Sequence, residues 1–198
     1  MVFSSAVLTG GAGRRMGAIG TAKPLLVLGG RPLAAYAMDT LQQSGATEVL
    51  AIGGDGEAAA GLRDLGFVVI EDTHPGRGPL EGIVRALEVA TAPLVAVLAC
   101  DTPFITAATV AKLVDAAGDR GSIASTDGRL EPLIAVYGHP VLAELATALE
   151  ADGAVHRVLE RLDLPTVAID PGEAFNVNAP ADLEEAERRL RRLDRPSL

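Results

Sequence analysis

Short apolar runs alternate with helix-like segments along most of this chain, and the alternation limits the folds open to it. Residues 94–98 are apolar throughout, which is typical of a strand buried on both faces of a sheet. Residues 5–9, 48–52 and 67–70 are further strand candidates, separated by segments with apolar residues at helical spacing. Strands joined through helices favour a parallel sheet. We therefore predict an α/β fold, a three-layer sandwich with a mostly parallel central sheet.

The remaining elements follow from the same periodicities and from turn residues. Asp127-Gly128 lies between two strand-like segments and predicts a hairpin or strand pair. Neither an internal repeat nor a low-complexity linker divides the 198 residues, so we expect residues 1–198 to form a single domain. Helices are expected over residues 32–44, 57–65, 79–90, 106–117, 141–150, 155–161 and 180–193, and extended segments over residues 25–28, 122–125, 130–137 and 164–169.

The charge and cysteine content exclude several classes of protein. The net charge of −9 disfavours binding to nucleic acids and to anionic membranes, because both repel an acidic surface. Cys100 is the only cysteine, so no intrachain disulfide can form. The sequence has neither a signal-peptide pattern at its start nor an apolar stretch near the roughly 20 residues of a membrane helix. We expect a cytoplasmic protein that acts on small molecules.

The ends of the predicted strands provide a test, because ligands of open α/β sheets bind beyond the carboxyl ends of the strands. Residues 8–17, after the first strand, read Leu-Thr-Gly-Gly-Ala-Gly-Arg-Arg-Met-Gly, and Lys23 follows. Glycine amides with arginine and lysine suit phosphate oxygens. Met16 excludes a dinucleotide fingerprint, and Ala22 with Pro24 around the lysine excludes a Walker A loop. A solvated turn is the alternative.

Acidic residues follow two other strands. Asp101 comes just after residues 94–98, where a carboxylate is well placed to hold Mg²⁺; its alternative role is to cap the next helix. Asp72 follows the third strand and is a candidate ligand of ribose, base or metal, unless it belongs to an ordinary surface loop. In the Asn-Val-Asn-Ala-Pro motif at residues 176–180, both amides are candidates for metal or substrate, with helix capping by Asn178 as the alternative.

Six motifs in one order resemble a known family. They are Leu-Thr-Gly-Gly-x-x-x-Arg-Met-Gly, Lys23, Glu71-Asp72, Gly-Pro-Leu-x-Gly, Cys-Asp-Thr-Pro-Phe and Asn-Val-Asn-x-Pro. Over about residues 5–190 this order is similar to the molybdenum cofactor guanylyltransferases (MobA) of the sugar-nucleotidyltransferase-like fold. The resemblance implies a Rossmann-like nucleotidyltransferase fold. It also implies transfer of GMP from GTP to molybdenum-molybdopterin, release of pyrophosphate, use of Mg²⁺, and contact with proteins that deliver or receive the cofactor.

The resemblance also implies roles for individual residues. Arg15, Lys23 and Asp101 are the expected catalytic residues, with Asp101 also the expected metal ligand. Asn176 and Asn178 are expected near the acceptor or the metal. The expected nucleotide-binding residues are Leu8, Thr9, Gly10, Gly11, Lys23, Gly53, Asp72, Gly78, Pro79, Leu80 and Asp101.

Two other functions stay open. Residues 23–26, Lys-Pro-Leu-Leu, leave room for a cytidylyltransferase or another NTP transferase that acts on a related phosphorylated acceptor. The second alternative is a nucleotide-binding module without catalysis, against which the presence of Arg15, Lys23 and Asp101 argues.

Overall fold

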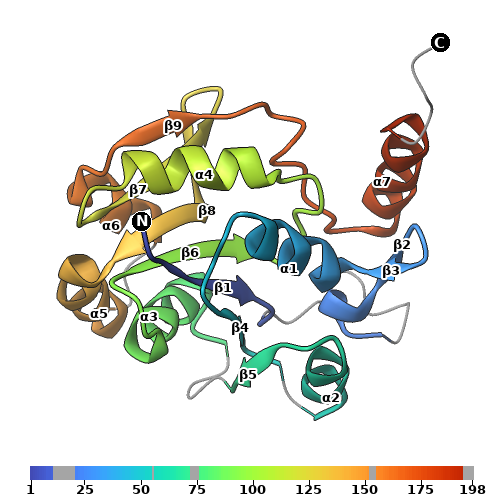
Figure 1. Cartoon of the computed structure of the whole chain (residues 1–198), viewed down its shortest axis with the longest axis horizontal. Helices are drawn as coiled ribbons and strands as arrows, with labels where there is room; N and C mark the ends of the chain where they lie inside the picture. The colour runs from blue at the N-terminus through green and yellow to red at the C-terminus, as the bar shows by residue number, and fades with distance from the viewer. Residues whose placement is uncertain (11–20, 55, 72–75, 152–154, 194–198) are drawn as a thin grey trace.

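A mixed sheet forms the centre of the molecule. The structure is a computed structural model that describes residues 1–10, 21–54, 56–71, 76–151 and 155–193. Within these residues seven strands pair in the order β5-β4-β1-β6-β8-β7-β9 (Figure 1). They are β1 (Ser4–Leu8), β4 (Val49–Ile52), β5 (Val68–Ile70), β6 (Leu94–Ala99), β7 (Gly121–Thr126), β8 (Arg129–Gly138) and β9 (Thr166–Ala168).

Strand direction confirms the mostly parallel sheet. Strands β5, β4, β1 and β6 pair in parallel, as do β7 and β9. Strand β8 pairs antiparallel with both β6 and β7, so it alone runs against the rest of the described sheet. The expected hairpin is thus the β7–β8 pair, with Asp127 at φ 49° in its turn.

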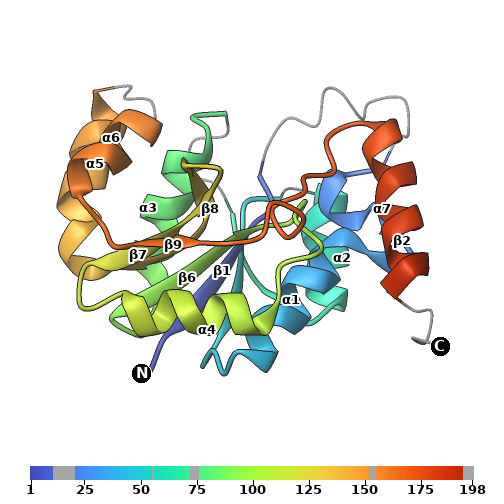
Figure 2. The ribbon, with the colours of Figure 1, turned by 90° about the horizontal axis from the view of Figure 1, so that it is seen from above.

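Helices cover both faces of the sheet, which confirms the three layers. In Figure 2, α1 and α4 lie on one face, and α3, α5 and α6 lie on the other. Residues of β6 alternate accordingly, because Leu94, Ala96 and Leu98 join one apolar cluster while Val95 and Val97 join the opposite one. The helices are α1 (Leu33–Gln43), α2 (Gly56–Asp64), α3 (Pro79–Val89), α4 (Ala107–Ala116), α5 (Leu142–Glu150), α6 (Val155–Leu162) and α7 (Pro180–Leu193).

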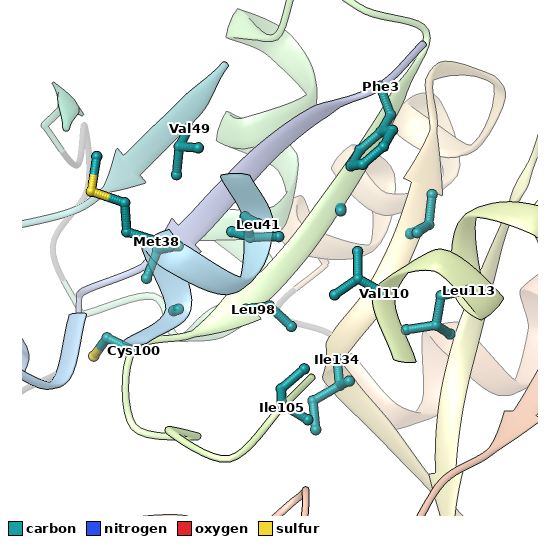
Figure 3. Packing of buried hydrophobic residues seen from close by; sticks show 14 of the residues in the cluster. Phe3, Met38, Leu41, Val49, Leu98, Cys100, Ile105, Val110, Leu113 and Ile134 are labelled. Atoms are coloured by element: carbon teal, nitrogen blue, oxygen red, sulfur yellow. The ribbon is translucent and has the colours of Figure 1, made fainter. Parts of the chain in front are cut away.

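Aliphatic side chains fill the space between sheet and helices. Figure 3 shows Leu41 of α1, Val110 and Leu113 of α4, Leu98 of β6 and Ile134 of β8 in one cluster. Each of these side chains is almost fully buried. Burial of this kind stabilises the fold by about 25 cal/mol for each Å² of apolar surface removed from water. None of the described helices has the length and apolarity needed to cross a bilayer.

A third, smaller apolar cluster lies at the end of the molecule where α7 packs beside β2 (Val27–Leu28) and β3 (Arg31–Pro32) (Figure 2). Its buried members come from segments far apart in the chain: Leu26, Leu28, Leu33, Val177 and Ala186. The cluster therefore ties the segment after Lys23 to the last helix and to the segment that precedes it.

Two predicted elements differ from the structure. The expected extended segment 25–28 begins instead with a 3₁₀ turn, η1 (Lys23–Leu25), in which the Leu25 N–H donates to the Ala22 carbonyl over 2.9 Å. Pro24 favours such a turn because its ring fixes φ near −65°. The last strand is shorter than residues 164–169, covering Thr166–Ala168. A second 3₁₀ turn, η2 (His139–Val141), precedes α5.

Candidate active site

The segment after β1 is held by one carbonyl of the neighbouring strand. The Thr9 and Gly10 N–H groups donate to the Ile52 carbonyl oxygen over 2.9 and 3.3 Å, and Thr9 Oγ1 donates to the same oxygen over 3.0 Å. The Gly53 N–H donates to the Ile70 carbonyl over 2.9 Å. These bonds align the ends of β1, β4 and β5. Leu8, Thr9, Gly10 and Gly53 therefore lie at the carboxyl edge of the sheet, as the sequence predicted.

Lys23 begins the η1 turn and is positioned through its neighbours. Leu25 packs against α2 at Gly61, where an added Cβ would lie 2.6 Å from Leu25 Cδ1. Leu26 is buried in the third apolar cluster, and its carbonyl accepts from the Leu33 N–H over 2.8 Å. The packing of Leu25 and Leu26 thus fixes the turn, and the long side chain of Lys23 reaches across the edge of the sheet.

Asp101 lies in the loop that follows β6. The Cys100 N–H donates to the Leu8 carbonyl over 3.2 Å, which holds the start of this loop beside the end of β1. The expected alternative, that Asp101 caps the next helix, is wrong. Thr106 is the N-cap of α4, because its side chain accepts from the Thr109 N–H over 3.2 Å. The Asp101 carboxylate is therefore available for another role.

Three predicted site residues meet at this edge. Lys23 Nζ donates to Asp101 Oδ2 and, over 2.7 Å, to Asn178 Oδ1. The partners are 78 and 155 residues from Lys23 in the chain, so only the fold brings them together. The side chains of Lys23 and Asp101 are 18% and 14% exposed, which leaves the pair partly shielded from solvent. Its electrostatic interaction is therefore stronger than that of a surface pair.

The second oxygen of the Asp101 carboxylate is suited to a metal ion. Asp101 Oδ1 is buried, and no hydrogen-bond donor among the described residues reaches it. Buried carboxylate oxygens are costly to leave unpaired. Within the described part of the chain, no group of three or more His, Cys, Asp and Glu side chains is arranged to hold a metal. One carboxylate still fits Mg²⁺, which is often bound by one or two carboxylates together with waters and substrate phosphates.

The start of α3 faces the same end of β1. Gly78 is the N-cap residue of α3 at φ 82°, a conformation that favours glycine, and Pro79 follows it. Leu80 is buried, whereas Gly78 and Pro79 are exposed. One turn later Gly82 lies against Leu8, where an added Cβ would be 3.1 Å from Leu8 Cδ1. Helix α3 thus packs closely on β1, and its exposed first residues lie near the site.

The two asparagines of the predicted acceptor side behave differently. Both lie exposed, but Asn178 Oδ1 accepts from Lys23 Nζ, whereas Asn176 Nδ2 donates to the Ala174 carbonyl over 3.0 Å. Asp182, in the first turn of α7, holds the segment before the helix, because its Oδ2 accepts from the Asn178 and Ala179 N–H groups over 2.9 and 2.8 Å. The predicted residues Gly11, Arg15 and Asp72 lie outside the described residues.

One positioning residue was missed by the sequence interpretation. Val177, between the two asparagines, is fully buried in the third cluster, and its N–H donates to the Asp101 carbonyl over 2.9 Å. It fixes Asn178 relative to the Asp101 loop. The sequence does contain a pattern that indicates this burial. An apolar residue flanked by two polar ones is typical of an extended segment with one buried face.

Cys100 has no nucleophilic role. Its side chain is 5% exposed, and burial, reinforced by the negative charge of Asp101, raises the pKa of the thiol to about 12. The thiol is therefore neutral at physiological pH and acts as a small buried side chain.

Known proteins share the sequence pattern and the fold of this chain. A family model for the MobA-like NTP transferase domain matches residues 5–166. A molybdenum cofactor guanylyltransferase of Cereibacter sphaeroides is 36% identical over 191 residues, covering 94% of this chain and 96% of the relative. The crystal structure of molybdopterin-guanine dinucleotide biosynthesis protein A from Archaeoglobus fulgidus has a TM-score of 0.76 at 28% identity and covers 96% of this chain and 99% of that one.

A more distant structure shares the fold alone. The 4-diphosphocytidyl-2C-methyl-D-erythritol synthase of Anaerococcus prevotii has a TM-score of 0.77 at 13% identity, with 96% of each chain covered. The resemblance found in the sequence motifs is confirmed by the family model and by the similarity to the Cereibacter protein over nearly the full length of both chains. The chain is a nucleotidyltransferase and belongs to the family of MobA-like NTP transferases.

Proposed function

We propose that this protein transfers GMP from GTP to molybdenum-molybdopterin and releases pyrophosphate. The observation that supports this most directly is the convergence of Lys23, Asp101 and Asn178 beside the glycine-containing end of β1. A cation, a carboxylate and an amide suit a triphosphate with its metal. The molybdenum cofactor guanylyltransferase of Cereibacter sphaeroides, similar over nearly its full length, supports the choice of GTP and of this acceptor.

The proposed transfer of GMP requires positioning of the reactants and neutralisation of charge rather than a strong base. A phosphate monoester acceptor is already largely dianionic at neutral pH, since its second pKa is about 6. In the proposed reaction the terminal phosphate oxygen of the acceptor attacks the α-phosphorus of GTP in line, and pyrophosphate leaves. Lys23 neutralises charge on the phosphates, together with the predicted Arg15.

Asp101 would hold Mg²⁺ through Oδ1, which no hydrogen-bond donor among the described residues reaches. When bound, Mg²⁺ neutralises negative charge on the phosphate oxygens as it builds in the transition state. Gly78 and Pro79, exposed at the start of α3, are the proposed contact surface for the base, and the buried Leu80 that follows them lies in the same apolar cluster as Leu8. Asn178, which accepts a hydrogen bond from Lys23 Nζ, is the proposed contact for the acceptor phosphate.

A substrate panel tests this proposal. The purified protein is incubated with Mg²⁺, molybdenum-loaded molybdopterin and one of GTP, CTP, ATP or UTP, and pyrophosphate release is measured. We expect release with GTP and formation of the guanine dinucleotide product, identified by its mass. Release with CTP in its place would support a cytidylyltransferase. Tight GTP binding without release against any phosphorylated acceptor would instead support a non-catalytic module.

A further inference from the structure

The hydrogen-bond partners of Lys23 raise a question about the nucleotide-free enzyme. Its ammonium group contacts Asp101 Oδ2 and Asn178 Oδ1, two oxygens that a divalent cation would also prefer. The Lys23 ammonium group therefore lies where a divalent cation bound to these oxygens would lie. This matters for the proposed function, on which the inference rests, because the same carboxylate is the proposed metal ligand.

A lysine ammonium and a divalent cation compete for one carboxylate. The Lys23 and Asp101 side chains are only 18% and 14% exposed, so water and salt screen their charges less than on an open surface. A second positive ion near Asp101 would meet the repulsion of the Lys23 ammonium. Among the described residues, no group of three or more His, Cys, Asp and Glu side chains is arranged to hold a metal and so offset this repulsion.

A bound triphosphate changes the competition between the Lys23 ammonium group and a divalent cation for the Asp101 carboxylate. Its oxygens bring several negative charges, and lysine is a point charge on a flexible four-carbon stem that can follow them. We infer that Lys23 keeps divalent cations from Asp101 in the nucleotide-free enzyme and frees the carboxylate only when a triphosphate draws its ammonium group away. Metal and nucleotide then bind cooperatively, and the enzyme does not hold the metal alone.

The test is a titration with Mn²⁺, a spectroscopic substitute for Mg²⁺, in the absence of nucleotide. Free Mn²⁺ is followed by electron paramagnetic resonance for the wild type and for Lys23→Met, which keeps an unbranched side chain of similar length without the charge. We expect Lys23→Met to bind Mn²⁺ about tenfold or more tightly than the wild type, within the range typical of coupled sites. Lys23→Arg retains the charge and should bind Mn²⁺ as weakly as the wild type.

Two control variants show whether a gain in Mn²⁺ affinity comes from the Lys23–Asp101 pair. Arg31→Met removes the cation of an exposed ion pair with Asp39 and should leave Mn²⁺ binding unchanged. The double variant Lys23→Met with Asp101→Asn should lose the gained affinity. Thermal unfolding with and without Mn²⁺ provides a second measurement, because Mn²⁺ should raise the Tm of Lys23→Met more than that of the wild type. This comparison also reveals a variant that fails to fold.

The inference is overturned if Lys23→Met binds Mn²⁺ no more tightly than the wild type, or if the gain persists without Asp101. Neither outcome depends on GTP or molybdopterin, so the Mn²⁺ titration and the substrate panel can fail independently. A positive titration with no guanylyl transfer would leave the Lys23 competition standing and reject only the choice of substrates.

Discussion

Replacement of Asp101 with Asn tests the site with the smallest change of shape. The amide has almost the volume of the carboxylate, and the backbone bond from the Val177 N–H to the Asp101 carbonyl is unaffected. The variant loses the negative charge that pairs with Lys23 and the anionic oxygen proposed to hold the metal. Fold and function should therefore respond to very different degrees.

The stability cost follows from the exposure of the pair. Exposed ion pairs contribute about 0–1 kcal/mol, and breaking a fully buried one costs about 3–5 kcal/mol. With side chains 18% and 14% exposed, the Lys23–Asp101 pair lies between these limits. We expect Asp101→Asn to lower the free energy of unfolding by about 1–2 kcal/mol, which corresponds to a drop in Tm of about 2–8 °C for a domain of this size.

The effect on catalysis should be much larger. Removal of one charge-stabilising group typically costs about 10²–10³ in turnover, and the variant loses a metal ligand as well. Pyrophosphate release with GTP and Mg²⁺ measures this loss, and scanning calorimetry measures the Tm. The matched control is Asp39→Asn, which breaks the exposed Arg31–Asp39 pair away from the site and should leave turnover unchanged.

Near-normal turnover of a folded Asp101→Asn protein would refute the metal assignment. A loss of turnover accompanied by global unfolding would refute the other half of the reasoning, since it would mean that the pair is a main support of the fold. The combination that agrees with the structure is a folded, slightly less stable protein with at least a hundredfold slower pyrophosphate release.

Three further outcomes follow from single contacts. Burial disfavours the charged form of Glu48, but donors from Ser4 and Thr91 outweigh it and lower its pKa. Its stabilising contribution is therefore full at neutral pH and lost as the pH falls through the lowered pKa, so urea unfolding of the wild type and Glu48→Gln should converge in acid. Gly138→Ala would place a Cβ 1.9 Å from a backbone carbonyl oxygen and should destabilise the protein by about 3 kcal/mol or more in the same assay. Cys100 should react with a thiol reagent at pH 8 only as fast as the protein unfolds, because its thiol is buried with a raised pKa.

The layers of the fold were predictable because each element has a strong local signal. The continuous apolar run at residues 94–98 corresponds to β6, buried throughout, and the helix expected over residues 106–117 corresponds to α4 with Thr106 as its cap. Helical and extended periodicities depend only on near neighbours, so sequence reasoning reaches them. The strand-end rule then placed Thr9 and Asp101 at one edge, as observed.

The contacts inside the site were less predictable because they join distant segments. Sequence reasoning took both asparagines as candidates for metal or substrate, with helix capping as an alternative for Asn178, yet Asn178 reaches Lys23 while Asn176 donates to the Ala174 carbonyl. The difference depends on Val177, whose burial against elements far away in the chain sets the rotation of the segment. The η1 turn was likewise missed: Pro24 favours it locally, but the packing of Leu25 against Gly61 of α2 joins segments far apart in the chain.

The last helix explains how three distant segments keep one geometry. The Gly29 N–H, in the β2–β3 turn after Lys23, donates to Glu187 Oε1 of α7 over 2.8 Å. The Arg189 guanidinium lies 4.1 Å from the ring centroid of Phe175 and 5.9 Å from that of Phe104, which flank the asparagine segment and the Asp101 loop. Helix α7 thus contacts all three segments that supply the site. None of the three segments belongs to a long strand, so the contacts with this helix help to fix their mutual positions. The last helix therefore stabilises the geometry of the site although much of its surface is charged.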